Sequence, residues 1–189
     1  MMKRSRDSME LERHWRLWPK MAGQRVPHRN AFKPYDLPSI MPNIAIAHLE
    51  GDKVKVVMAG TNIIDRIATE ITGADYLAFV REDQRPLVVN LIKCVCSHPV
   101  GACVHMESMY ARGYAAKLEV TLLPVAGEAE DTNYILALAL PRPDVAAELA
   151  APFRGDRVEA DWREPTEWID LGFGLPAQAT LLDNLTVSI

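Results

Sequence analysis

The stretch VKVVMAGTNIIDRIATEITG, residues 54–73, decides the fold more than any other part of the chain. Apolar residues alternate with others in its first part, which predicts a strand over Lys53–Ala59. The small residues Ala59-Gly60-Thr61 then turn the chain into a helix, with Thr61 as the expected N-cap and Gly73 as the end. Isoleucines recur at helical spacing at positions 63, 67 and 71. The segment therefore predicts a strand, a tight turn and a helix with one apolar stripe.

Four further strands are expected around this unit. Asn43–Leu49 is strand-like, and Gly51-Asp52 supplies a two-residue hairpin turn into the strand at Lys53. Three more runs follow downstream, which are Val100–Tyr110, Tyr114–Leu123 and Tyr134–Leu140. The polar residues of 114–123 fall on one face, which indicates a sheet with one buried and one polar face. In the last run we expect Leu136 and Leu138 to point inward.

Helices separate the first two strands from the last three. A shorter helical piece is expected over Ala74–Val80 and a longer helix over Pro86–Cys96, whose proline suits a first helical turn. The order of two strands, several helices and three strands predicts an α+β fold. We expect a five-stranded antiparallel sheet with helices on one face.

An amphipathic helix over residues 9–18 precedes the sheet. Leu11, Trp15 and Trp18 fall on one stripe of this helix, and Pro19 ends it. Two explanations fit so much aromatic surface on a short helix: the stripe packs on the chain's own sheet, or it contacts a second subunit. We take the three side chains as candidate dimer contacts.

The chain divides into three parts by composition. Residues 1–36 hold the amphipathic helix and a proline-rich lead-in, 37–141 the core, and 142–189 an extension rich in prolines and alternating charges. The extension also holds the apolar residues Trp162, Trp168, Ile169, Leu171 and Phe173. Leaving such surface in water costs about 25 cal/mol per Å². We therefore expect the extension to pack on the core or on a second subunit.

The charge and composition exclude several classes of protein. A net charge of −4 argues against a nucleic-acid partner, because phosphate binding needs a clustered basic surface. No run approaches the roughly 20 apolar residues that span a bilayer, and the N-terminus lacks the apolar run of a secretion signal. Three cysteines are an odd number and a poor disulfide framework. We expect a cytoplasmic protein that does not contact a membrane.

Short motifs, taken together with this strand order, resemble a bacterial family of single-PAS-domain proteins, formerly described only as a domain of unknown function. The motifs are Trp15 and Trp18, Arg25-Val26-Pro27-His28-Arg29, Pro34-Tyr35-Asp36-Leu37-Pro38, Met41-Pro42, Ala59-Gly60-Thr61, Ile71-Thr72-Gly73, Arg112-Gly113-Tyr114 and Leu123-Pro124. They cover residues 11–141, and their order and spacing are more specific than any single motif. Ala68 departs from the pattern, since glycine is common there in similar proteins.

The resemblance implies a PAS domain, which holds a small molecule or cofactor between its sheet and helices and signals through a dimer or a docking surface. It implies a non-catalytic sensor or adaptor that binds a small apolar ligand or a partner protein, the latter an unidentified signalling protein, and that signals through protein–protein contacts. We also expect a homodimer. The alternatives are a carrier of an apolar metabolite and a small α+β enzyme that uses the same cleft. The sequence requires no cofactor.

The inward-facing apolar residues of the predicted helices and strands are the candidates for the lining of the cleft. The candidates are Ile63, Ile67, Tyr76, Val88, Leu91, Ile92, Val95, Leu118, Val120, Leu136 and Leu138. Nearly all are apolar, and Tyr76, Asn90 and His105 are the polar groups expected nearby. Three alternatives stay open: a collapsed core without ligand, an apolar or amphipathic ligand, and haem or flavin. No histidine or cysteine occurs in a motif typical of either cofactor.

The cysteines and histidines near position 100 do not predict a metal site. Cys94 and Cys96 are about 200° apart around a helix axis, so they cannot face one metal ion. Cys103 and His105 share a strand face, but they need a further ligand from elsewhere. We therefore predict no metal and treat the cysteines as small core residues.

No residue pattern in the sequence predicts catalysis, because serine, histidine and acidic residues do not occur in any motif of a known catalytic set. Glu119 lies on the polar face of its strand, where it is a solvent-facing charge near Lys117 or Arg112. If the tryptophan helix covers that face instead, Glu119 needs a partner from the helix segment.

Overall fold

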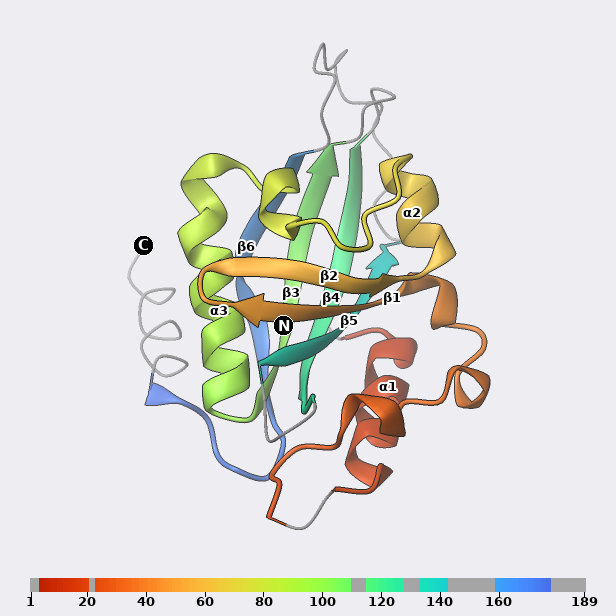
Figure 1. Cartoon of the computed structure of the whole chain (residues 1–189), viewed down its shortest axis with the longest axis vertical. Helices are drawn as coiled ribbons and strands as arrows, with labels where there is room; N and C mark the ends of the chain where they lie inside the picture. Colours follow the sequence, from red (N-terminus) through yellow and green to blue (C-terminus); the bar gives the residue numbers. More distant parts are fainter. Residues whose placement is uncertain (1–3, 21–22, 110–114, 128–132, 143–158, 178–189) are drawn as a thin grey trace.

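The computed structural model describes residues 4–20, 23–109, 115–127, 133–142 and 159–177, and one antiparallel sheet forms its centre (Figure 1). The strands lie in the order β2-β1-β5-β4-β3-β6. Their bounds are β1 Ile44–Glu50, β2 Lys53–Ala59, β3 Val100–Met109, β4 Ala115–Val125, β5 Tyr134–Pro141 and β6 Glu159–Asp170. The predicted α+β class with an antiparallel sheet is confirmed.

Short helices and turns connect these strands. The α-helices of the described residues are α1 Arg6–Leu17, α2 Thr61–Ile67 and α3 Arg85–Ser97. The 3₁₀ turns are Arg29–Ala31, Pro34–Asp36, Met41–Asn43, Tyr76–Phe79 and Glu82–Gln84. No helix in the described part of the chain has the length and apolar character needed to cross a membrane.

The sheet has six strands instead of the predicted five, because part of the C-terminal extension joins it. β6 pairs with β3, with Asp170 opposite Val100 at one end and Glu159 opposite Met109 at the other. Pro165 stands opposite Val104, where the register of the pair shifts. Proline has no N–H to donate, and an edge strand tolerates it because one side of that strand needs no ladder bonds. The strand was not predicted because it contains this proline and many charged residues, neither of which is typical of a strand.

The chain after β6 turns at Asp170. Its carboxylate Oδ1 accepts hydrogen bonds from the backbone N–H groups of Gly172, Phe173 and Gly174, at 2.8, 3.1 and 3.0 Å. These donors, with Gly172 first among them, hold the pKa of Asp170 below its ordinary value. Arg16 of α1 donates to the Asp170 carbonyl at 2.6 Å. The described end of the extension is thereby tied to the first helix.

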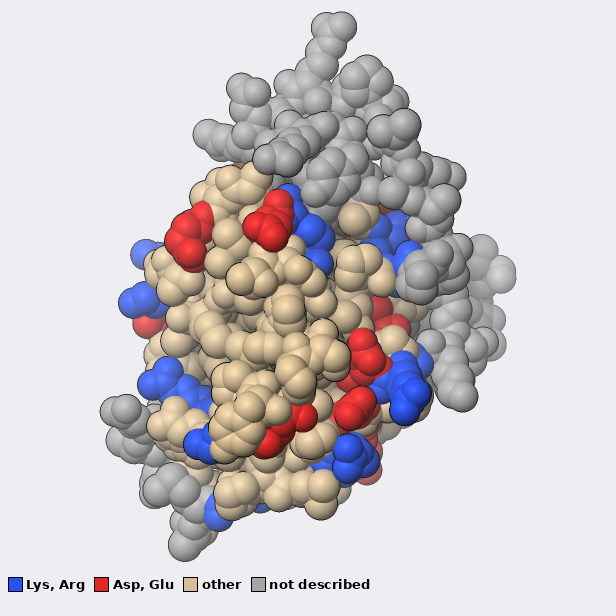
Figure 2. Space-filling model, turned by 90° about the vertical axis from the view of Figure 1, so that its right-hand side faces the viewer, with Lys and Arg blue, Asp and Glu red and all other residues tan. Residues whose placement is uncertain are grey.

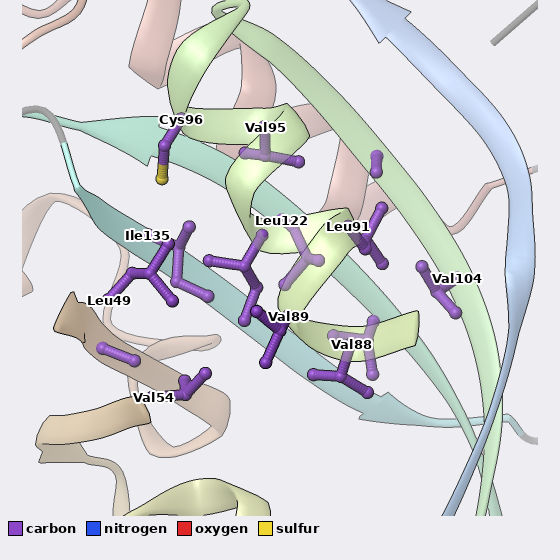
Figure 3. Close-up of a cluster of buried hydrophobic side chains, with 14 of the residues drawn as sticks. Leu49, Val54, Val88, Val89, Leu91, Val95, Cys96, Val104, Leu122 and Ile135 are labelled. Atoms are coloured by element: carbon purple, nitrogen blue, oxygen red, sulfur yellow. The ribbon is translucent and has the colours of Figure 1, made fainter. Parts of the chain in front are cut away.

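Both faces of the sheet are buried, because the N-terminal helix, whose packing on the chain's own sheet was one of the two expected alternatives, covers the second face. On one face α3 packs over the sheet in a cluster that includes Val95, Leu122 and Ile135 (Figure 3). On the other face α1 and the chain that follows it form a second cluster. Trp15 is fully buried there, and its Nε1 donates to the Pro124 carbonyl at 2.7 Å.

Burial of both faces explains why the orientation of β5 was predicted wrongly. Leu136 and Leu138 belong to the cluster beneath α1, while Ile135 and Ala137 point to the α3 face. The expectation that Leu136 and Leu138 line the cleft is therefore wrong. A strand buried on both faces carries apolar side chains on both sides. The alternation of its side chains therefore does not indicate which side faces α1 and which faces α3.

The side chains predicted as dimer contacts lie inside the chain. Leu11 and Trp15 are 0% exposed and Trp18 is 7% exposed. Trp18 packs edge-on against Phe32, with ring centroids 5.6 Å apart. The stripe packs on the chain's own sheet, and the alternative contact with a second subunit is wrong for these three side chains because the chain itself already buries them.

The turn between β2 and α2 requires glycine. The Gly60 N–H donates to the Ile44 carbonyl at 2.8 Å, and a Cβ on Gly60 would lie 2.5 Å from the Pro42 carbonyl oxygen. Gly60, and not Thr61 as predicted, is the N-cap of α2. A side chain at position 60 would push the start of α2 away from the 3₁₀ turn before β1.

α2 is shorter than predicted, because it ends at a residue in the left-handed conformation. Ala68 has φ of 57°, and its N–H donates to the Ile64 carbonyl at 2.7 Å. A left-handed conformation is unfavourable for alanine, since Cβ crowds the following carbonyl oxygen. Gly73, with φ of 84°, ends the next turn of the chain without this cost.

We expect Ala68→Gly to stabilise the protein by about 0.5–1 kcal/mol, because glycine relieves the strain and this gain exceeds its larger chain entropy when unfolded. Thermal unfolding followed by circular dichroism should show a Tm higher by about 2–4 °C per kcal/mol. Gly73→Ala is the opposite control. Its added Cβ would meet no atom within 4 Å, so a lower Tm there reports backbone strain alone. A lower Tm for Ala68→Gly would contradict the assigned conformation.

Candidate functional site

A cavity of about 100 Å³ lies between the sheet and the α2 side of the molecule. Its roof comes from α2 and the chain that follows it, and consists of Ile63, Arg66, Ile67, Ile71, Tyr76 and Phe79. Its floor and sides come from the strands and α3, and include Ala45, Ala47, Val54, Val56, Ile92, Met106, Ser108, Leu118, Val120, Leu122, Ile135, Ala137 and Ala139. The cavity is therefore bounded by five strands and two helices.

A row of small side chains in the sheet explains why space remains here. Ala45 of β1 stands between Ala59 of β2 and Ala137 of β5 in the strand register. Ala137 in turn stands opposite Leu122 of β4. Alanine side chains reach only one carbon above the sheet, so helices that rest on larger neighbours leave a gap over them. Ala45 and Ala137 stay partly exposed although their strands are central, so water-sized molecules reach the cavity floor.

Among the described residues, three lining side chains carry polar groups, and these are Arg66, Tyr76 and Ser108. Arg66 is the charged one. Its Nη1 donates to Asn43 Oδ1 at 2.9 Å, and its Nη2 donates to the Ala139 carbonyl at 3.0 Å. Ser108 of β3 is 4% exposed. The wall thus combines a mostly apolar surface with one guanidinium, the pattern of a site for a small molecule with one polar end.

The structure separates the eleven predicted cleft residues into three groups. Ile63, Ile67, Tyr76, Ile92, Leu118 and Val120 line the cavity. Val88, Leu91 and Val95 pack beside it, in the closed cluster between α3 and the sheet (Figure 3). Leu136 and Leu138 lie on the opposite face. Asn90 is exposed on α3, and His105 lies outside the cavity, so neither contributes the expected polar group.

The prediction missed Arg66 and the alanines of the floor. Two signals in the sequence point to them. Arg66 is three residues after Ile63 and one before Ile67, so it shares the inward face of the helix. The pairs Ala45/Ala47 and Ala137/Ala139 alternate within strands whose other residues are large. Alternate residues of a strand point to the same face of the sheet, so small side chains at these positions leave space between that face and the helices above it.

Glu119 on the other face of the sheet anchors the start of α1. It is 6% exposed and stands opposite His105 in the register. Its carboxylate accepts from the Ser5 N–H at 3.0 and 3.1 Å and from the Ser5 hydroxyl at 2.6 Å. Ser5 is the N-cap of α1, so the carboxylate also lies near the positive end of the helix dipole. The expected solvent-facing position is wrong, and the covering helix supplies the partner that burial requires.

One group of side chains could in principle hold a metal ion. The ligand atoms of Cys103, His105 and Glu119 lie within 4.8 Å of one another, and such donors suit zinc. Both Glu119 oxygens, however, already accept hydrogen bonds from Ser5, and Arg142 Nη1 lies 3.5 Å from His105 Nδ1. A guanidinium so close disfavours a cation. Of this cluster, Glu119 serves to hold the start of α1 on the sheet.

The other two cysteines lie apart from this cluster. Cys94 and Cys96 are on α3, and Cys96 Sγ lies 3.8 Å from the Tyr134 carbonyl. Burial raises the pKa of the Cys94 thiol, which disfavours the thiolate needed for metal binding or nucleophilic attack. None of the chain's cysteines or histidines lines the cavity. The described lining therefore offers neither a histidine nor a cysteine to haem iron.

Comparison with known proteins gives one family. The sequence profile of a family described as PAS domain matches residues 3–140 of the 189. No protein of curated function matches the chain.

Several solved structures are similar in fold. A LOV protein of Rhodobacter sphaeroides is 15% identical, with 55% of this chain and 60% of that chain covered and a TM-score of 0.44. A PAS domain from Colwellia psychrerythraea is 10% identical, with 54% and 86% covered and a TM-score of 0.45. A blue-light activated histidine kinase of Erythrobacter litoralis is 14% identical, with 56% and 35% covered and a TM-score of 0.41. At such identity these structures say nothing about a ligand of this chain.

Replacing Glu119 with alanine should loosen α1. We expect Glu119→Ala to lower the free energy of unfolding by about 2–3 kcal/mol, because the Ser5 donors lose a buried charged acceptor. Chemical denaturation measures this loss. Glu107→Ala is a matched control on the neighbouring strand, where the register sets Glu107 opposite Lys117, and should cost no more than about 1 kcal/mol. Equal losses in the two variants would show that Glu119 has no special role.

We also predict that the purified protein carries no stoichiometric metal. Elemental analysis after purification without chelator should give less than about a tenth of an equivalent of zinc or iron, because Ser5 and Arg142 occupy the surroundings of the candidate ligands. A full equivalent of zinc that disappears in Cys103→Ser would overturn the structural role given to Glu119 in this cluster.

Proposed function

Because the chain belongs to the PAS domain family, we propose that it is a non-catalytic sensor or adaptor that binds a small, largely apolar ligand in the cavity and signals through protein–protein contacts. The observation that carries the proposal is the cavity itself, which lies over the alanines of the central strands. Small-molecule sites are concave, mostly apolar and equipped with a few placed polar groups. The wall described above has this composition.

The lining argues against the alternative of an enzyme. The described lining residues include no aspartate, glutamate, histidine, cysteine or lysine. General acid–base and nucleophilic catalysis draw mostly on those side chains. Arg66, Tyr76 and Ser108 remain, and a serine becomes a nucleophile only beside a general base, which the described lining does not offer. Binding without chemistry is therefore the function that this cavity supports.

A route from the cavity to the surface favours a sensor over a simple carrier. Arg66 joins α2 to Asn43, the last residue of the 3₁₀ turn before β1. Gly60 joins the start of α2 to β1 through the Ile44 carbonyl. A ligand that shifts α2 would therefore also shift the chain before β1. That chain carries Tyr35, which is 76% exposed.

We infer that a second copy of the chain is one partner and that it contacts this side of the molecule. Figure 2 views the side where α2 and the chain before β1 lie, and shows a broad area without Lys, Arg, Asp or Glu. An uncharged area does not repel its own copy in a two-fold contact, and exposed aromatic residues are enriched at interfaces. The unidentified signalling protein of the proposal would use the same side. Three free cysteines fit the reducing conditions of the cytoplasm.

Native mass spectrometry of the full chain tests ligand and assembly together. We expect a dimer and an added mass of a small organic molecule, which Ala137→Phe should abolish because the new ring fills the cavity. Ala78→Phe is the matched control, since Ala78 is exposed on the turn that roofs the cavity and does not line it. A bound mass that persists in Ala137→Phe would place the ligand elsewhere.

The same preparations distinguish a sensor from a carrier. A sensor should show altered hydrogen exchange over residues 34–43, or an altered dimer fraction, when the ligand is removed. A carrier should bind and release the ligand with neither change.

A further inference from the structure

We propose that the ligand of the cavity is an amphipathic carboxylic acid, whose carboxylate binds Arg66 and whose apolar chain lies over the alanines of the sheet. This inference rests on the proposed function, since it names the chemical class of ligand for the same cavity. It depends on how Arg66 is placed, how it is paired and what surrounds it.

Arg66 is a cation in an apolar wall whose hydrogen-bond partners are neutral. Its two contacts are the Asn43 side-chain amide and the Ala139 backbone carbonyl. The ion pairs within the described residues do not include Arg66. A half-buried guanidinium normally gains from a carboxylate partner, because neutral acceptors offset less of the lost hydration. The charge of Arg66 is thus uncompensated within the described part of the chain.

The remaining donors of Arg66 can serve a ligand. A guanidinium has five N–H groups in a planar fork, and the two contacts above use one on each terminal nitrogen. A carboxylate matches this fork better than any neutral group, since it accepts two parallel hydrogen bonds from it. Asn43 and the Ala139 carbonyl hold the side chain in place, so a ligand would meet a positioned donor.

The rest of the cavity wall determines the chemistry of the part of the ligand that lies away from Arg66. Ile63 and Ile67 flank Arg66 on the same face of α2, and Ala45 and Ala137 form the floor beneath. A ligand held at Arg66 therefore meets mostly apolar groups along its length, with Tyr76 and Ser108 as the other polar side chains of the described lining. This disfavours sugars and dicarboxylic acids, whose further polar groups would outnumber these two partners. The cavity of about 100 Å³ accommodates a short alkyl chain or a single ring.

An alternative role for Arg66 is purely structural. Its two hydrogen bonds join α2 to the turn before β1 and to β5, and this brace would be useful without a ligand. The two roles differ in what they predict for binding. A brace affects all ligands of the cavity equally, whereas an anchor affects only those that carry a negative charge.

Calorimetric titration of the full-length protein with hexanoate and with 1-hexanol separates these roles. The two probes have chains of the same length and differ in the charged group. We expect wild-type protein to bind hexanoate at least about tenfold more tightly than hexanol, because the charged hydrogen bonds are made in a largely apolar site. Arg66→Gln should remove that preference and leave hexanol binding unchanged. Asn43→Ala, which removes one of the two hydrogen bonds of the brace but keeps the charge and the bond to the Ala139 carbonyl, should retain that preference.

Each outcome decides a different point. Equal affinity for both probes overturns the carboxylic acid and leaves the cavity as a binding site. Binding of neither probe overturns the proposed function as well. A preference for hexanoate that survives Arg66→Gln assigns Arg66 to the brace. If Arg66→Gln does not fold, nitrogen NMR of the wild-type protein decides, since hexanoate and not hexanol should shift the Arg66 guanidinium signal.

Discussion

Burial of the central sheet on both faces is the constraint on which the rest of the structure depends. α1 and the chain after it cover one face, with Trp15 fully buried and hydrogen-bonded to the Pro124 carbonyl. A helix on this face has to bring acceptors and donors for the polar residues that the strands present there. Ser5, the N-cap of α1, donates to Glu119, and the Ser8 and Thr121 hydroxyl oxygens lie 2.6 Å apart in a hydrogen bond. These contacts meet the requirement. α1 is therefore part of the core and not an appendage.

With one face closed, the other face is free to hold a cavity. The sheet does not need to bury every apolar residue under α3, because the α1 side already contributes a second full cluster. The alanines of β1 and β5 can therefore leave a gap without costing the fold its stability. Gly60 and Ala68 set where α2 begins and ends, and so determine that Arg66 and its isoleucine neighbours meet over that gap. Backbone geometry at two small residues thus positions Arg66, the charged residue of the described lining.

Much of the fold was predictable because its signals are local. Alternation located the five strands from β1 to β5 to within one or two residues, and the small-residue turn located the start of α2. The site was less predictable. Ile63 and Ile67 were predicted from helical spacing and Tyr76 as a polar group near the cleft, and all three line the cavity. Leu136 and Leu138 were assigned to the wrong face because both sides of β5 are apolar. Arg66 was missed because a lone arginine on a short helix ordinarily faces solvent.

The sequence by itself determined which segments are strands and helices, since periodicity and turn residues act over a few positions. It also determined that the chain belongs with PAS domains, through motifs spread over most of its length. Only the tertiary structure decided that β6 completes the sheet beside β3 and that the tryptophan stripe packs inward. It alone brought Ser5 to Glu119, which are 114 residues apart. Contacts between distant segments depend on which surfaces are left open once the local elements have formed, and no local pattern records that.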